Sequence, residues 1–137
     1  MPKGSQLLCS ILLATIPLIA FAGPVEPYQA ARFDALTAQG KPVVVAVHAS
    51  WCPTCRVQAP IQRRLMASAP FKDYTMFIVN FDRDRAALRR FHVAMQSTMI
   101  VFRGTQEVGR SIGDTNEASL RALMLRASKP VNTPAGS

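Results

Sequence analysis

The chain has 137 residues, of which 49% are hydrophobic and 18% are charged. This length suits a single domain, and the composition excludes a chain that is disordered over long stretches, because enough apolar side chains are present to form a packed core. The formal net charge of +8 favours acidic partners, anionic surfaces or simply solubility. The basic residues are scattered and do not alternate with aromatic ones, so we expect no binding of nucleic acid.

Residues 1–22 have the pattern of a secretory signal peptide. Lys3 supplies a positive charge near the start, an apolar stretch follows over residues 7–21, and Ala22 ends the small-x-small sequence of a cleavage site. The apolar stretch is short for a membrane-spanning helix and is interrupted by Pro17, so we expect cleavage and export to a bacterial periplasm. The alternative is an uncleaved segment that anchors the protein to the membrane.

The first element expected after this segment is an amphipathic helix over residues 28–39, preceded by a short connecting segment over residues 24–27. The apolar or small positions of this helix are Ala31, Phe33, Ala35, Leu36 and Ala38. Gly40 is typical of a helix end, and Pro42 favours a return to extended backbone.

Residues 43–49 form a continuous apolar run rich in β-branched side chains, which is typical of a strand buried on both faces of a sheet. A helix is expected over residues 52–68, with a kink at Pro60. Its expected apolar positions are Ala59, Ile61, Leu65 and Met66, and its expected polar positions are Arg56, Gln58, Gln62, Arg63 and Arg64.

The second half of the chain continues the alternation of strands and helices. We expect strands over residues 74–81, 97–102 and 107–112, a helix over residues 84–92 that Asp82 caps, and a last helix that begins at Asp114 or Thr115 and ends near Ser128. Parallel strands joined by helices, followed by an antiparallel hairpin, indicate an α/β domain over residues 23–129 with a mixed central sheet of about four strands. Residues 130–137 are expected to form a flexible tail.

Cys52 and Cys55 are separated by two residues and lie between the first buried strand and the start of the next helix. Two cysteines at this spacing can close a small disulfide and open it again. The unpaired N–H groups and the dipole at a helix N-terminus stabilise a thiolate, which is the nucleophile of disulfide exchange. The third cysteine, Cys9, lies in the expected signal peptide. The pattern therefore predicts a redox-active pair with a reactive Cys52.

The sequence Trp51-Cys52-Pro53-Thr54-Cys55, with Pro60 in the following helix and Gly113 after the last strand, resembles the thioredoxin family. The resemblance implies a thioredoxin-like three-layer α/β/α fold and a thiol-disulfide oxidoreductase with no cofactor beyond its own redox-active disulfide. It implies that Cys52 attacks the substrate and Cys55 resolves the mixed disulfide, while Trp51, Pro53 and Thr54 shape the site. The implied partners are a disulfide-containing protein or small molecule and a membrane thiol-disulfide protein that re-reduces the pair.

Three features depart from the pattern of that family. Ser97, followed by Thr98, stands where thioredoxins carry a cis-proline whose loop contacts the substrate, and we expect a trans peptide bond here. Ala46 and Ile78 stand in place of the buried acid and the lysine that serve the resolving cysteine. His48 stands where thioredoxins often carry tryptophan, and histidine is the residue type best suited to proton transfer near neutral pH, so His48 is a candidate for that role.

Other functions stay open from the sequence. His48, Cys52 and Cys55 offer nitrogen and sulfur ligands that suit copper or zinc, so the alternative is a metal-handling or client-binding module without redox turnover. A third hypothesis is a binding domain whose two cysteines form a stable disulfide. Among oxidoreductases we favour a reductase, because Pro53 and Thr54 bring neither charge nor histidine between the cysteines. We expect a monomer.

Overall fold

The computed structural model describes residues 23–128. The expected signal peptide over residues 1–22 and the expected tail over residues 130–137 lie outside the described residues. In chain order the elements are β1 (Val25–Pro27), α1 (Ala30–Ala38), β2 (Pro42–His48), α2 (Pro53–Ala67), the 3₁₀ turn η1 (Ala69–Phe71), β3 (Thr75–Asn80), α3 (Arg85–Arg90), β4 (Thr98–Arg103), β5 (Gln106–Ile112) and α4 (Glu117–Leu125). None of the helices in this part of the chain is long and apolar enough to cross a membrane.

The five strands form one mixed sheet in the order β1-β3-β2-β4-β5. β3 pairs in parallel with β1 and β2, whereas β4 is antiparallel to both β2 and β5. The expected α/β architecture with a terminal antiparallel hairpin is therefore confirmed.

The expectation of a mere connecting segment over residues 24–27 was wrong, because residues Val25–Pro27 pair with β3 as a fifth strand. This strand has three residues and lies at the edge of the sheet, where it pairs with β3 alone. Proline is tolerated at such an edge, where the missing N–H breaks no ladder. A short edge strand has no apolar run, so the sequence pattern did not indicate it.

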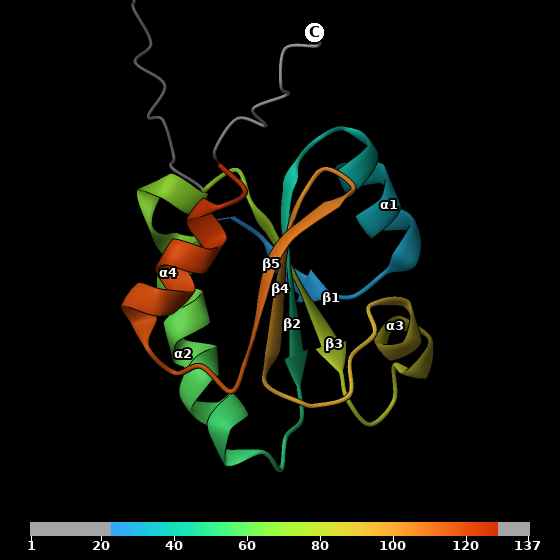
Figure 1. Cartoon of the computed structure of the whole chain (residues 1–137), viewed down its shortest axis with the longest axis vertical. Coiled ribbons are helices and arrows are strands. Elements are labelled where there is room, and N and C mark those ends of the chain that lie inside the picture. The colour runs from blue at the N-terminus through green and yellow to red at the C-terminus, as the bar shows by residue number, and fades with distance from the viewer. Residues whose placement is uncertain (1–22, 129–137) are drawn as a thin grey trace, which may run out of the picture.

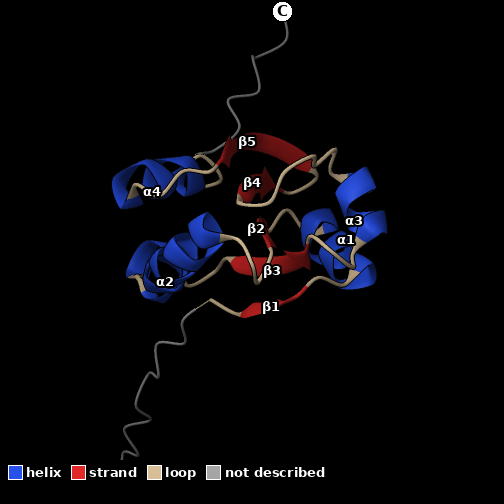
Figure 2. Cartoon of the chain, turned by 90° about the horizontal axis from the view of Figure 1, so that it is seen from below, coloured by secondary structure: helices blue, strands red, loops and turns tan. Residues whose placement is uncertain are grey.

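Helices cover both faces of the sheet, and α2 and α4 lie on one face while α1 and α3 lie on the other (Figures 1 and 2). The three-layer arrangement expected from the thioredoxin-like sequence is confirmed. β2 runs through the middle of the sheet and is buried on both faces, as its continuous apolar run predicted. It carries the chain to the site described below.

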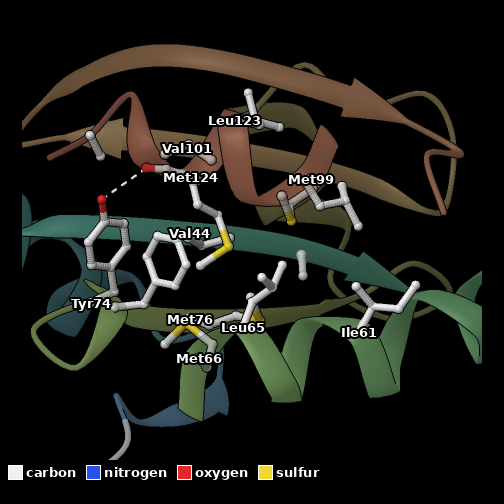
Figure 3. Packing of buried hydrophobic residues seen from close by; sticks show 14 residues of the cluster. Val44, Ile61, Leu65, Met66, Tyr74, Met76, Met99, Val101, Leu123 and Met124 are labelled. Atoms are coloured by element: carbon white, nitrogen blue, oxygen red, sulfur yellow. Dashed lines mark hydrogen bonds between the residues drawn. The ribbon is translucent and has the colours of Figure 1, made fainter. Parts of the chain in front are cut away.

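Large apolar side chains fill the space between the sheet and the pair α2 and α4 (Figure 3). The cluster includes Val44, Ile61, Leu65, Met66, Met76, Met99, Val101, Leu123 and Met124. Tyr74 is also buried there, and its hydroxyl donates to the Met124 carbonyl at 2.9 Å, so the only polar atom of this ring is satisfied.

The face expected for the first helix was wrong in part. Ala31, Ala35 and Ala38 are exposed, whereas Phe33 and Thr37 are buried. Phe33 sets the orientation because a large ring loses far more water-exposed apolar area on burial than an alanine methyl group does. Thr37 is tolerated inside because its hydroxyl donates to the Phe33 carbonyl at 2.9 Å.

Two expected helix caps also differ in the structure. Asn116, rather than Asp114 or Thr115, caps α4, and its side chain accepts from the Ser119 N–H at 2.9 Å. Asp82 does not cap α3, because Asp84 occupies the position before that helix and its carboxylate accepts from the Asn80 N–H at 2.7 Å. These differences move the ends of elements and leave the topology unchanged.

Candidate active site

Cys52 lies between the end of β2 and the first turn of α2. Its backbone is extended, with φ −83° and ψ 115°, and its sulfur accepts from the Cys55 N–H at 3.2 Å. Pro53 follows in the first helical position, where its missing N–H leaves no helical hydrogen bond unmade. The thiol of Cys52 therefore caps the helix that carries Cys55, and the unpaired N–H groups of α2 face its sulfur.

The two cysteines are buried together under the turn. Cys52 and Cys55 have exposed fractions of 2% and 1%, and they form a small cluster with Ala49 against which Phe81 packs. Both are free thiols, so the structure describes the reduced form of the pair. The Cys55 sulfur lies 3.9 Å from the Val47 carbonyl oxygen.

The hydroxyl of Ser97 lies between the two sulfurs. Its oxygen is 3.2 Å from Cys52 Sγ and 3.1 Å from Cys55 Sγ, and either the hydroxyl or a thiol can donate in each pair. Ser97 is itself buried, with 3% of its surface exposed. The structure thus brings together three residues that are far apart in the sequence, in a site closed to bulk water.

The backbone of the Ser97 loop is held on both sides. Its N–H donates to the Val47 carbonyl and its own carbonyl accepts from the Gly113 N–H, each at 3.0 Å. Ser97 has φ +60°, in the left-handed region that side-chain-bearing residues rarely adopt. No cis peptide bond occurs within residues 23–128, so the expected trans bond before Ser97 is confirmed.

Gln58 is a site residue that the sequence pattern misassigned. It was expected on the polar, solvent-facing side of its helix, but only 2% of its surface is exposed. Its amide nitrogen donates to the Ser97 carbonyl at 3.2 Å and to the Asp114 carbonyl at 2.6 Å. Gln58 thereby joins α2 to the Ser97 loop and to the segment before α4. A glutamine three residues after Cys55 in a helix that must face the sheet was the available signal.

The surroundings of Cys52 favour its thiolate. Burial raises the pKa of this thiol, but the Cys55 side chain, the Ser97 hydroxyl and the backbone N–H groups of Cys55 and Thr54 lower it by more. The pKa of Cys52 therefore lies below its usual value. A thiol that ionises more readily supplies a larger fraction of nucleophile at neutral pH.

The described residues place no buried acid at the position where the thioredoxin pattern has one. Ala46 on β2 lies directly opposite Ile78 on β3, so the two positions that hold an acid and a lysine in that pattern are neighbours here and are both apolar. None of the carboxylates in residues 23–128 is buried. Ser97 is the only hydroxyl within hydrogen-bond distance of both sulfurs in this part of the chain.

Trp51 lies at the surface directly before Cys52 in the chain. Just over half of its surface, 53%, is exposed, its indole N–H donates to the Asp82 carboxylate at 3.1 Å, and its ring meets Phe81 edge to face. This contact explains what Asp82 does in place of capping α3. Thr54 is half-buried in the first turn of α2 and Pro53 is exposed there.

Thr98 and His48 lie at the margin of the site. The Thr98 hydroxyl donates to the Met95 carbonyl at 2.6 Å and so braces the Ser97 loop from within. His48 is half-buried and lines a cavity of about 210 Å³ with Ala59 and Arg63, among others. In the described part of the chain no group of three or more His, Cys, Asp or Glu residues gathers as a metal site would require. His48, Cys52 and Cys55 therefore do not form a set of metal ligands in the described structure.

Comparisons with known proteins agree with this geometry. A family model described as thioredoxin matches residues 24–126. Thioredoxin-1 of Saccharomyces cerevisiae (strain ATCC 204508 / S288c) is 28% identical over 98 residues, which are 72% of this chain and 93% of that protein. The bifunctional thioredoxin reductase/thioredoxin of Mycobacterium leprae (strain TN) is 32% identical over 96 residues, and the chain spans only 21% of the length of that protein.

Solved structures share the same architecture. Trxlp from Edwardsiella tarda EIB202 is 45% identical and superposes with a TM-score of 0.71, covering 73% of this chain and 97% of that one. The thioredoxin from Trypanosoma brucei brucei is 22% identical and shares the fold, with a TM-score of 0.65 over 77% of this chain and 90% of that one.

Proposed function

The chain belongs to the thioredoxin family and carries a buried CxxC dithiol, and on this premise we propose that it reduces protein or small-molecule disulfides in a bacterial periplasm. It is a thioredoxin-type redox protein; the direction of electron flow and the compartment are the parts proposed here. The observation that carries the proposal is the hydrogen-bonded position of Cys52, whose pKa lies below its usual value.

The first chemical step is attack by the Cys52 thiolate on one sulfur of the substrate disulfide. A Cys52–substrate disulfide forms, the substrate S–S bond breaks, and the first substrate thiolate leaves and takes up a proton. Ser97 and the Cys55 N–H stabilise the thiolate before the attack, because both lie within 3.2 Å of the Cys52 sulfur.

The second step is attack by Cys55 on the Cys52 sulfur. The Cys55 thiol must first lose its proton, and no buried carboxylate in the described residues accepts it. Once Cys52 is bound to the substrate, the Ser97 hydroxyl is free to donate to the Cys55 thiolate, from which it lies 3.1 Å. The Cys52–Cys55 disulfide then closes, and the second substrate thiolate leaves and takes up a proton from water in place of the one that Cys55 released. Two electrons have passed from the dithiol to the substrate.

Two features of the sequence support the direction and the compartment. Pro53 and Thr54 add no cation between the cysteines, and residues 1–22 have the pattern of an export signal. An exported dithiol has no access to the cytosolic thiol pool, so a membrane thiol-disulfide protein must re-reduce it.

The test of the reaction is insulin reduction together with the reduction potential of the Cys52–Cys55 pair. We expect Cys52→Ala to abolish reduction, Cys55→Ala to accumulate mixed disulfides, and the potential to lie near that of thioredoxin, about −270 mV. A potential near about −120 mV would reverse the direction, and full activity of Cys52→Ala would refute the mechanism.

The test of the compartment is expression of the whole chain in a bacterium, followed by fractionation and N-terminal sequencing. We expect a periplasmic protein that begins at Gly23. A full-length protein in the membrane fraction would support the anchored alternative, and a full-length protein in the cytosol would refute export.

A further inference from the structure

A groove with a basic rim lies beside the dithiol. Its volume is about 470 Å³. It is lined by Phe81, Arg85, Leu88, Arg89, His92, Val93 and Ala94, and we call it the α3 groove. Its floor is apolar, while its rim carries two guanidinium groups and one imidazole.

The two arginines of the α3 groove have no partner of opposite charge in the part of the chain that the structure describes. Arg85 and Arg89 are four residues apart on α3, so both side chains project from one side of that helix. Neither takes part in an ion pair within residues 23–128, whereas Arg90 is paired with Asp34 and Arg110 with Glu107. As far as residues 23–128 are concerned, both guanidinium groups are therefore available to an anion outside the chain.

The nearest acidic residues along the chain are already engaged elsewhere. Asp82 accepts from the Trp51 indole N–H, and Asp84 accepts from the Asn80 backbone N–H at 2.7 Å. Both carboxylates therefore accept from donors other than the two arginines, and neither forms an ion pair with Arg85 or Arg89.

The α3 groove and the dithiol share a wall. Phe81 lines the groove, packs against the cluster that holds Cys52, and meets the ring of Trp51. At the other end of the groove, Ala94 lies three residues before Ser97 in the loop that joins α3 to β4. In Figure 1 this loop runs along the lower edge of the molecule toward the turn between β2 and α2. A polypeptide whose disulfide reaches Cys52 therefore lies next to this groove.

We propose that the α3 groove selects disulfide substrates in which acidic residues flank the cystine, with Arg85 and Arg89 binding the carboxylates. The inference rests on the function proposed above and names the substrate class of that same site. The occupant is an acidic polypeptide segment, because the groove pairs cations with an apolar floor of Phe81, Leu88 and Val93 that takes side chains as well as charges.

The test compares two peptides that carry the same disulfide, one flanked by Asp and Glu and the other by Asn and Gln. We expect the purified protein to show a kcat/KM about fivefold higher for the acidic peptide at low ionic strength, since two exposed charge pairs contribute modestly. This ratio should fall toward one as salt is added, because exposed charges are screened. Equal kcat/KM values for the two peptides at low salt would refute the proposal.

The variants locate the effect. Arg85→Gln with Arg89→Gln should bring the acidic-to-neutral ratio close to one. The matched control, Arg63→Gln with Arg126→Gln, removes the same charge from exposed positions on α2 and at the end of α4, and should keep the ratio. A ratio that falls equally in both double variants would mean that net charge, not the α3 groove, attracts the substrate.

A binding measurement separates this proposal from the proposed reaction. Trp51 is the only tryptophan of the chain and touches Phe81 of the groove, so its fluorescence can report occupancy by an acidic peptide with serine in place of cysteine. We expect saturable binding that inorganic phosphate does not abolish and that the Arg85 and Arg89 double variant loses. If the acidic peptide binds but the protein reduces no disulfide, the proposed reaction is refuted and the α3 groove remains a peptide site. If the protein reduces disulfides but does not bind the acidic peptide in preference to the neutral one, the α3 groove is refuted as a peptide site. Complete displacement of the acidic peptide by phosphate would refute it as well.

Discussion

The hydroxyl oxygen of Ser97 lies 3.2 Å from the sulfur of Cys52, within a site that is almost closed to water. A hydrogen bond to an ionised group is stronger than one between neutral groups. This contact therefore stabilises the Cys52 thiolate relative to the thiol, and with it the reduced form of the pair relative to the disulfide.

The first prediction concerns removal of this hydroxyl by Ser97→Gly, because glycine accepts the φ of +60° found at this position. The titration of Cys52 should move to higher pH, and its alkylation by iodoacetamide should slow severalfold at a pH below that titration. The potential of the pair should become more negative, since the reduced form loses a stabilising contact. The pH dependence of the alkylation rate measures the first effect, and equilibration with glutathione measures the second. An unchanged alkylation profile would show that the Ser97 hydroxyl contributes to packing and does not stabilise the thiolate.

The second prediction separates the backbone of Ser97 from its hydroxyl. Ser97→Ala and Ser97→Gly both remove the oxygen, but alanine retains the strain of a left-handed backbone. We expect Ser97→Ala to be less stable than Ser97→Gly by about 1 kcal/mol in urea unfolding. Equal stabilities would mean that the loop relaxes out of the left-handed region when the hydroxyl is lost.

The third prediction is a pH dependence of stability in the reduced protein. The pKa of Cys52 is lower in the folded chain than its usual value, so the unfolded state binds more protons between the two values and the free energy of unfolding rises with pH there. The contribution is complete above the unfolded pKa and is lost as the pH falls through the folded pKa. Urea unfolding of reduced protein over a pH series should show this rise, and Cys52→Ala should lack it.

The fourth prediction concerns Gln58, which ties the Ser97 loop to α2. Gln58→Met keeps the volume of the side chain but leaves the Asp114 carbonyl without its 2.6 Å donor. We expect a loss of about 1–3 kcal/mol in stability, the range for a buried group left unsatisfied, and a shift of the Cys52 alkylation profile because the Ser97 carbonyl also loses a donor. The second readout distinguishes a positioning role from a purely structural one.

Gln62→Met is the matched control for that variant. Gln62 is buried one turn further along α2, but its amide makes a long 3.5 Å contact with Gln58 and none with the Ser97 loop. It should lower stability by less and leave the alkylation profile unchanged. If both variants shift the profile equally, loosening of α2 rather than the link to Ser97 is responsible.

The strand β2, the pair Cys52 and Cys55, and the helix α2 could be predicted from the sequence, because each is determined by residues that are close together in the chain. β2 is apolar throughout, and Cys52 and Cys55 are separated by two residues. β1 was missed because an edge strand of three residues gains its hydrogen bonds from β3, whose contribution no local pattern contains.

Gln58 and Ser97 show why the rest of the site required a structure. From the helical pattern alone, a polar glutamine is expected to face the solvent. Gln58 is buried instead, because its amide donates to two carbonyls from segments that are distant in the sequence. Ser97 was placed in the site through its position in the family pattern, yet its distance to both sulfurs depends on the pairing of its backbone with Val47 and Gly113. Apart from the helical spacing of Gln58 from Cys55, the local sequence carries no sign of which polar groups the long-range contacts bury.

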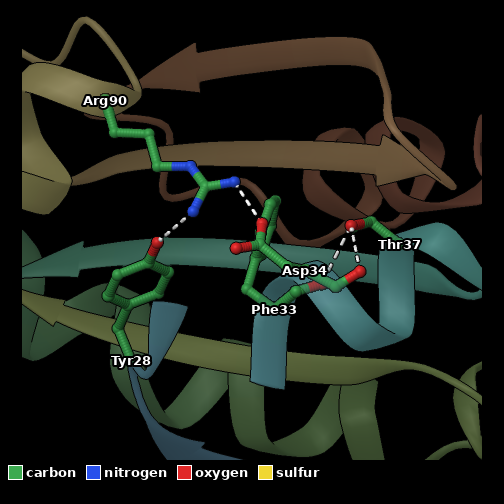
Figure 4. A network of polar contacts seen from close by, with 5 residues as sticks. All are labelled: Tyr28, Phe33, Asp34, Thr37 and Arg90. Carbon is green, nitrogen blue, oxygen red and sulfur yellow. Dashed lines mark hydrogen bonds and ion pairs between the residues drawn. The ribbon is translucent and has the colours of Figure 1, made fainter. Parts of the chain in front are cut away.

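The last prediction concerns Arg90, which joins α3 to α1 on the face away from α2 and α4 (Figure 4). Its guanidinium donates to the Tyr28 hydroxyl at 3.1 Å, pairs with Asp34 and lies 4.8 Å from the centre of the Phe33 ring. Arg90→Met keeps an apolar stem, so its effect isolates the charged group, and we expect a loss of about 1 kcal/mol in urea unfolding. Asp34→Asn removes the ion pair and keeps the ring contact, so it should lose less, and its loss should shrink in high salt because exposed pairs are screened. An equal loss in the two variants would assign the effect to the ion pair instead of the aromatic contact.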